Sequence, residues 1–183
     1  MMRTLCLQAP SFDGFDGGAG SRYQARREIR SFWYPTWLAQ VAAVVPDSKL
    51  VDAVPHRLGL ADILRDARSY DLAVLHTSTP SFASDVRVVE ALKAANPALK
   101  AGFVGAKVAV EPQASLEASP LIDFVAGNEF DFTIKEVAED RDWRTIAGLS
   151  YRDAAGIIRH NPPRAILESM DELPFVTPIY KRC

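Results

Sequence analysis

One stretch, residues 71–82, constrains the fold more than any other part of the chain. Residues 72–75 form an unbroken apolar run that is too short for a helix and suits a parallel strand covered on both faces. The run leads into a hydroxyl-rich turn at residues 76–81, and apolar residues then recur at helical spacing from Phe82 to Leu92. A buried strand, a short polar turn and a helix predict one unit of an α/β fold.

The same alternation repeats along the chain. Strands are expected at residues 4–7, 49–54, 72–75, 99–104 and 122–126. Helices are expected at residues 35–45, 61–69, 82–96 and 112–119 and from residue 130 onward, and the first should bury Trp37, Leu38, Val41 and Val45. Five buried strands that alternate with helices predict a flavodoxin-like, Rossmann-like doubly wound α/β sheet, parallel throughout, with the strand order 2-1-3-4-5.

The alternation of strands and helices ends near residue 146. Two short stretches, residues 149–152 and 157–160, flank a turn at residues 153–156 and predict a β-hairpin. Prolines then follow at high density, which is typical of a linker. We therefore expect a domain at residues 1–145 and, at residues 146–183, a hairpin with the start of a linker that the sequence cuts off before a further domain.

The connection at residues 11–34 is long for a strand-to-helix turn and contains four glycines and a basic cluster, Arg22, Arg26, Arg27 and Arg30. Loops of this length inside compact domains are usually functional or mobile, and we expect this one to be mobile. The glycines do not form a dinucleotide-binding loop, because the first lies too far from the strand and no helix opens on the last. A basic cluster of this kind is more commonly a solvated face than a binding site.

The composition narrows the class of protein. The chain has 183 residues, of which 48% are hydrophobic and 24% charged, as in ordinary globular domains. A net charge of −2 argues against a nucleic-acid partner, and no apolar run is long enough for a membrane span. The two cysteines, Cys6 and Cys183, have no metal-ligand spacing, so we expect no metal site and a cytoplasmic setting with reduced thiols.

Parallel strands all end at one edge of their sheet, so the turns at residues 76–81, 105–107 and 127–129 are expected to lie together. The crevice is expected beside strands one and three, where the strand order reverses. Small residues and hydroxyls at such an edge can meet a ligand, although Ser and Thr also serve as helix caps. His76 is either a ligand or base, or a packed and hydrogen-bonded residue. A phospho-receiver site is excluded, because His76 and Thr77 stand where its acceptor aspartate is needed.

Several turn motifs resemble those of the cobalamin-binding half of B12-dependent radical SAM enzymes. The matching stretches are residues 103–107, 122–129, 148–153, 161–164 and 173–175. Residues 10–23 and 33–38 are more closely similar to the hopanoid-biosynthesis-associated radical SAM proteins of the J type. The resemblance covers essentially the whole chain.

The resemblance implies that cobalamin lies over the carboxyl edge of the sheet, with its nucleotide tail in the crevice. Small residues would let the backbone approach the flat macrocycle, and hydroxyls would satisfy polar groups of the tail. The hydroxyl turn, the glycine-pair turn and the Gly-Glu turn of the family match cofactor-binding residues Thr77, Ser78, Thr79, Ser81, Gly105, Ala106, Lys107, Gly127, Asn128 and Glu129. Alanine stands for the second glycine of the pair.

Two departures from the family pattern change what is expected. The Asp-x-His-x-x-Gly motif, which supplies a lower cobalt ligand in other cobalamin proteins, is missing after strand one, so a tail-off form without a histidine ligand is implied. The three-cysteine iron–sulfur motif is also missing. S-adenosylmethionine and the iron–sulfur cluster would therefore belong to a missing radical SAM domain of the same polypeptide, and this fragment would have no catalytic residues of its own.

By resemblance, the chain is expected to be the cobalamin-binding domain of a radical SAM enzyme of hopanoid biosynthesis that modifies the head group or its cyclitol. Its partners would be cobalamin and the radical SAM domain. One alternative is a flavodoxin-like domain that has lost its ligand and serves as a docking or lid module. A nucleotide-binding enzyme domain is a further alternative, but no loop of the chain has the context that such a domain requires.

Overall fold

The computed structural model describes residues 1–10 and 34–182. The predictions about the first loop, which are its mobility, its glycines and its basic cluster, concern residues 11–33 and lie outside the described residues. The strand and helix predictions fall within them.

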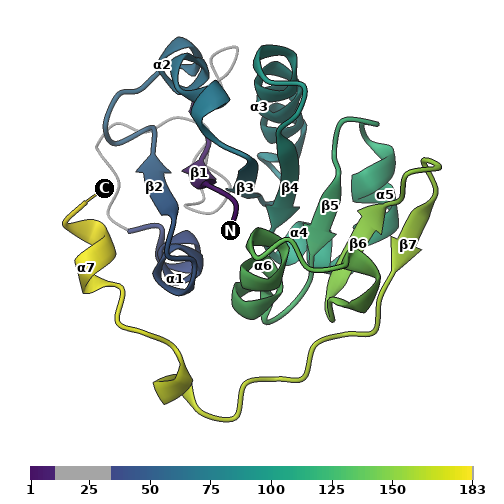
Figure 1. Ribbon diagram of the computed structural model, residues 1–183. Coiled ribbons are helices and arrows are strands. Elements are labelled where there is room, and N and C mark those ends of the chain that lie inside the picture. Colours follow the sequence, from purple (N-terminus) through teal and green to yellow (C-terminus); the bar gives the residue numbers. More distant parts are fainter. Residues whose placement is uncertain (11–33, 183) are drawn as a thin grey trace.

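The described strands form one seven-stranded sheet in the order β2-β1-β3-β4-β5-β6-β7 (Figure 1). The strands are β1 (Thr4–Gln8), β2 (Ser48–Asp52), β3 (Leu72–His76), β4 (Lys100–Val104), β5 (Phe124–Ala126), β6 (Leu149–Arg152) and β7 (Ile158–His160). Strands β1 to β5 are parallel, which confirms the predicted order 2-1-3-4-5. The predicted hairpin also forms, and it continues the same sheet because β6 pairs antiparallel with β5.

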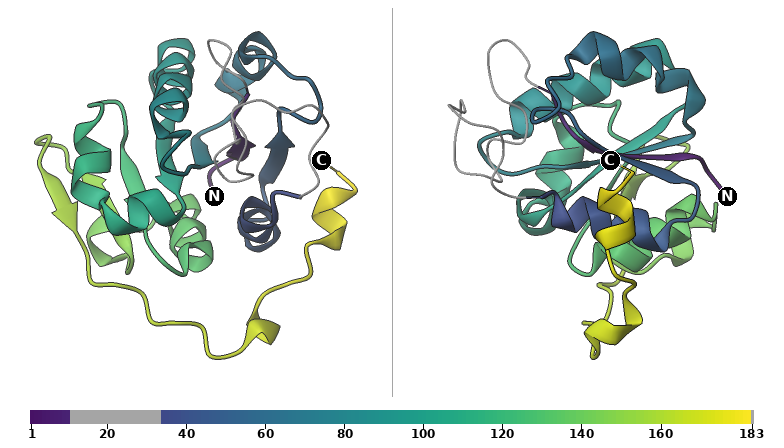
Figure 2. Two further views of the ribbon diagram at one scale, coloured as in Figure 1. Left: turned by 180° about the vertical axis from the view of Figure 1, so that it is seen from behind. Right: turned by 90° about the vertical axis from the view of Figure 1, so that its left-hand side faces the viewer.

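Helices cover both faces of the sheet, as the right-hand view of Figure 2 shows. They are α1 (Thr36–Val44), α2 (Leu60–Arg65), α3 (Phe82–Ala95), α4 (Ala106–Val110), α5 (Pro112–Glu117), α6 (Phe130–Ala138) and α7 (Thr177–Tyr180). Single 3-10 turns form at Ala67–Ser69, Trp143–Thr145 and Met170–Glu172. Within the described part of the chain, no helix is long and apolar enough to cross a membrane.

Two apolar clusters make up the core, one on each face of the sheet. One joins α1 and α6 to the sheet, and the other joins α2, α3, α4 and α5 to the opposite face. The central strands therefore need apolar residues on both sides, and all five residues of β1 are buried. Strand β6 has the core on one side only, and its burial alternates accordingly. Burial raises the pKa of the Cys6 thiol to about 12, so this cysteine stays protonated and unreactive.

The prediction that Trp37 belongs to the core is wrong. Its side chain is 58% exposed, whereas Leu38 and Val41 of the same helix are fully buried. The first turn of α1 lies at the carboxyl edge of the sheet, where the Trp37 ring stacks on His76 with a centroid distance of 5.6 Å. Trp37 has the sequence spacing of the buried residues of α1, but it lies beside the turn after β3 and does not pack on the sheet.

After β7 the chain continues as an extended segment, residues 161–176, which we call the strap. The strap leads to α7, which packs against α1. The strap runs past α6 toward α1 (Figures 1 and 2). Gln40 Nε2 donates to the Pro174 carbonyl at 3.0 Å, and Ile179 of α7 is buried against α1. The proline-rich stretch predicted to be a linker is therefore attached to the domain at its two ends, whereas most of residues 165–172 are exposed (Figure 1).

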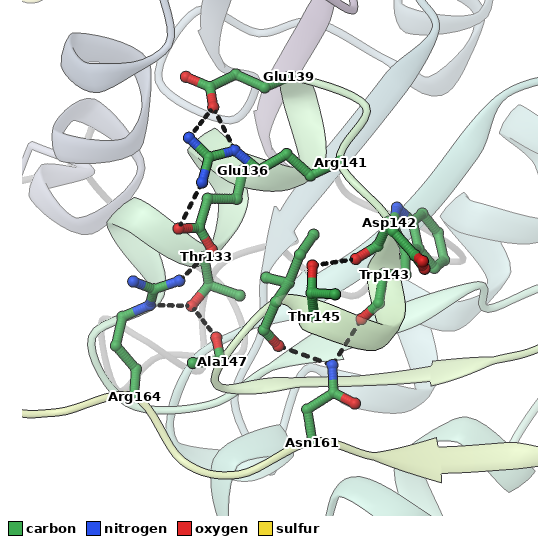
Figure 3. Close-up of polar contacts among 11 residues, drawn as sticks. Thr133, Glu136, Glu139, Arg141, Asp142, Trp143, Thr145, Ala147, Asn161 and Arg164 are labelled. Atoms are coloured by element: carbon green, nitrogen blue, oxygen red, sulfur yellow. Dashed lines mark hydrogen bonds and ion pairs between the residues drawn. The ribbon is translucent and has the colours of Figure 1, made fainter.

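Polar side chains fix the start of the strap (Figure 3). Asn161 Nδ2 donates to two backbone carbonyls of the 143–146 turn, at 2.6 and 2.7 Å. Arg164 Nε donates to the Thr133 hydroxyl at 2.9 Å, and its guanidinium is ion-paired with Glu136. The Asn-Pro-Pro-Arg stretch is consequently a structural anchor between the hairpin and α6.

Candidate functional site

A pocket of about 730 Å³ lies at the carboxyl edge of the sheet, where the turns after β3, β4 and β5 meet. Its volume is within the range of small-molecule sites. The structure brings nine of the ten predicted site residues to its wall: Thr77, Ser78, Thr79, Gly105, Ala106, Lys107, Gly127, Asn128 and Glu129. The tenth, Ser81, is buried beneath the turn and does not line the pocket. The described lining follows β3, β4 and β5. Most of the segment after β1 lies outside the described residues, so the expected crevice beside β1 and β3 stays a prediction.

Further residues line the pocket that were not among the predicted site residues. Trp37 comes from α1, and Met170 and Leu173 come from the strap. Their positions in the wall depend on tertiary packing. The stretches that carry the resemblance include Trp37 and Leu173, but no role in the site was expected of either residue. His76 and Asp131 also line the pocket, and both belong to turns that were recognised. Asp131 lies two residues beyond the predicted Glu129, a proximity that could have indicated it.

The hydroxyl turn after β3 is held together by its own hydrogen bonds. The Thr77 hydroxyl donates to Asp85 Oδ2 at 2.7 Å, and the Ser78 and Ser81 hydroxyls are 3.0 Å apart. The Ser78 N–H also donates to Ser81 Oγ at 3.2 Å. Two of the four hydroxyls, those of Thr77 and Ser81, are thus committed to the start of α3, and Ser78 and Thr79 remain the more accessible pair.

A buried acid lies beneath this turn. Asp85 is fully buried, and burial raises the pKa of its carboxyl to about 7 against the opposing effect of hydrogen bonds from Thr77 and Ser81. Its Oδ1 has no hydrogen-bond partner among the described residues. The carboxyl is therefore expected to lower the stability of the folded protein when it is charged, because a buried charge is costly unless both of its oxygens are hydrogen-bonded.

Gly105 closes the turn after β4, where the backbone approaches β3 closely. Its φ is +119°, a conformation that L side chains rarely adopt. A Cβ at this position would lie 2.4 Å from the Thr77 carbonyl oxygen. Only glycine fits here, and the close contact sets the distance between two walls of the pocket.

Replacing Gly105 with alanine is expected to destabilise the protein by about 2 kcal/mol or more, since it combines backbone strain with overlap on a carbonyl oxygen. The matched control is Gly127→Ala, whose Cβ would meet nothing closer than the Gly148 carbonyl oxygen at 3.7 Å. Urea unfolding of both variants tests this expectation. Equal stability of Gly105→Ala and the wild type would contradict the geometry of the turn.

The charged groups of the pocket are unevenly distributed. The Lys107 ammonium is ion-paired with Glu111 and lies 5.4 Å from the centroid of the Phe82 ring. Glu129 adopts a left-handed conformation with φ 56°, and its side chain does not cap α6. Non-glycine residues in this conformation are uncommon and often occur at functional sites. The two acidic residues of the described wall, Glu129 and Asp131, both lie at the start of α6, whereas Lys107 comes from the start of α4.

A second cavity, of about 1040 Å³, lies between the Trp143–Thr145 turn and the β6–β7 hairpin. It is the larger of the two, and the buried Nε of Arg152 and Nε1 of Trp143 in its wall have no hydrogen-bond partner among the described residues, but two of its arginines are ion-paired. Arg144 pairs with Asp142 at 2.6 Å, and Arg159 pairs with Asp153 at 2.9 Å. We take the pocket at the carboxyl edge as the candidate site, because nine of the ten predicted residues meet there.

The fold and site together define a Rossmann-like α/β domain of the doubly wound class, with its pocket at the carboxyl edge of the parallel strands. No protein-family model matches the chain. A protein of Pyrococcus horikoshii named the uncharacterized methyltransferase PH0819 is 30% identical over 158 residues, which cover 81% of this chain and 34% of that protein. The chain thus spans about a third of the length of the curated relative that it matches.

Two solved structures share the fold. The radical S-adenosylmethionine methyltransferase TsrM from Kitasatospora setae, with cobalamin and an iron–sulfur cluster bound, is similar with a TM-score of 0.63 at 14% identity, over 95% of this chain and 31% of TsrM. The cobalamin-dependent S-adenosylmethionine radical enzyme OxsB, with aqua-cobalamin and S-adenosylmethionine bound, gives a TM-score of 0.59 at 14% identity, over 70% of this chain and 19% of OxsB. The chain therefore has the fold of a part of cobalamin-dependent radical SAM enzymes.

Proposed function

We propose that this chain is a cobalamin-binding domain and that its pocket at the carboxyl edge holds the cofactor. One observation carries the proposal: nine residues implied by a sequence resemblance to cobalamin proteins meet at a single pocket. The fold is one that TsrM and OxsB share, and the structures of both contain cobalamin.

The residues of the pocket fit such a ligand. Gly105, Ala106 and Gly127 leave the backbone open to a flat macrocycle, and Trp37 and Leu173 supply apolar surface. When bound, cobalamin would supply a cobalt centre that can accept and donate a methyl group. Our proposal keeps the tail-off form without a histidine ligand. His76 lies in the wall and stacks on Trp37, so the spectrum of the reduced complex can be used to check for a nitrogen ligand.

For the parent protein we propose a cytoplasmic radical SAM enzyme in which another domain holds S-adenosylmethionine and the iron–sulfur cluster. This division is supported by the lengths of the matches, because the chain covers about a third of PH0819 and of TsrM. The proposed boundary near residue 146 falls before the hairpin that completes the sheet. A role in hopanoid head-group modification is a finer proposal, and it rests on the resemblance of residues 10–23 and 33–38 alone.

The rival function, a docking or lid module without a ligand, is favoured by one observation. The Thr77, Ser78 and Ser81 hydroxyls already have partners within the chain. A titration of the chain with hydroxocobalamin, followed by absorbance and by co-elution in gel filtration, distinguishes the two functions. We expect one cobalamin per chain with a dissociation constant on the order of micromolar. No binding at about 1 mM hydroxocobalamin would favour the docking module.

A further inference from the structure

Asp131 is a pocket residue with one carboxyl oxygen that lacks a partner. It lies in the first turn of α6 and lines the pocket beside Glu129. Its Oδ1 is closed off from solvent and has no hydrogen-bond partner among the described residues. Buried polar atoms are almost always hydrogen-bonded, so an unpartnered carboxylate oxygen at a pocket wall calls for an explanation.

The one compensating donor to the carboxyl among the described residues is its own backbone N–H, which lowers the pKa of Asp131 less than burial and Glu129 raise it. Burial and, second, the charge of Glu129 raise the pKa of Asp131 to about 6, although a carboxylate in the first turn of a helix is normally favoured. The other titratable groups in the described wall are His76 and Lys107. Lys107 is engaged by Glu111, and neither it nor His76 is among the groups that shift the pKa of Asp131.

A ligand that brings its own N–H donor would satisfy this carboxyl. Corrinoids carry primary amides around the macrocycle, and each amide needs an acceptor when it leaves water. We propose that Asp131 is a recognition residue that accepts a hydrogen bond from a peripheral primary amide of the bound corrinoid, an inference that rests on the proposed cobalamin site. The anionic phosphate of the tail would then lie away from Glu129 and Asp131, on the side of Ser78 and Thr79.

The test compares the wild type with Asp131→Asn in titrations with hydroxocobalamin at about pH 5.5 and about pH 7.5. The wild type should bind up to roughly fourfold more tightly at the higher pH, because a carboxyl with a pKa of about 6 is only about a quarter charged at about pH 5.5 and its hydrogen bond is strongest when it is charged. Asp131→Asn should bind about tenfold more weakly than the wild type at about pH 7.5 and lose this pH dependence. Its melting temperature at that pH should not fall, because the variant removes a buried charge.

Asp66→Asn, which changes an exposed acid at the end of α2 that does not line the pocket, is the matched control, and it should retain the affinity and the pH dependence of the wild type. The outcomes separate the two proposals. If the wild type binds no cobalamin, the proposed function fails. If the wild type binds and Asp131→Asn binds with the same affinity and the same pH dependence, the role of Asp131 is wrong and the cobalamin site stands. A pH dependence that survives in Asp131→Asn would assign the titration to another group, such as His76.

Discussion

Replacing Ala106 with tryptophan is expected to abolish the binding of hydroxocobalamin while the domain stays folded. Ala106 is the exposed first residue of α4 and lines the pocket between the turns after β3 and β5. An indole at this position would occupy the space that a flat ligand needs, and it would displace no core residue. We expect affinity to fall about 100-fold or more, as measured by absorbance titration.

The matched control is Ala155→Trp, which places the same side chain on the exposed turn between β6 and β7. This variant should bind hydroxocobalamin as the wild type does, and circular dichroism should show both variants folded. Binding by Ala106→Trp with wild-type affinity would remove the pocket at the carboxyl edge as the site.

The free energy of unfolding is expected to fall as the pH rises from about 4 to about 7. The pKa of Asp85 is about 7 in the folded protein, against an ordinary value of 3.8, so the folded state binds a proton that the unfolded chain has lost. Stability is then fully present below the unfolded pKa and is lost as the pH rises through the folded one. The difference between these pKa values corresponds to roughly 4 kcal/mol, and Asp131 acts in the same direction.

The surface acids Asp62, Asp142 and Asp153 have lowered pKa values, so their effect on stability has the opposite sign and is confined to lower pH. Urea unfolding at about pH 5 and about pH 8 measures the expected change. Asp85→Asn keeps an oxygen that can accept from the Thr77 hydroxyl, and it should remove most of the pH dependence. A wild-type stability that rises across this range would show that Asp85 does not titrate as we expect.

Most of the fold could be predicted because its signals are local and agree with one another. The five apolar runs mark strands that are covered on both faces, and parallel pairing then follows from the helices between them. The helix α4 was missed, since Ala106–Val110 is only five residues long and no side chain caps its start. The sequence also did not indicate that β6 pairs with β5, because this pairing depends on the register of the hairpin against a sheet edge.

The site could be predicted in part for a different reason. Parallel strands end at one edge, so three turns that are distant in sequence were expected to meet, and nine of their ten residues do. The sequence could not indicate which of these side chains face the pocket and which are hydrogen-bonded within the domain. The hydroxyls of Thr77 and Ser81 serve the buried Asp85 and its turn, and Trp37 and Leu173 reach the pocket only through the packing of α1 and the strap.

The most direct test of the cobalamin site is a crystal structure of this chain grown with hydroxocobalamin. We predict one corrinoid at the carboxyl edge, with its macrocycle against the turns at residues 105–107 and 127–129 and its nucleotide tail beside residues 77–79. Asp131 should lie within hydrogen-bond distance of a peripheral amide. A corrinoid bound instead in the cavity beside Trp143 and the hairpin, with the carboxyl-edge pocket empty, would contradict the account.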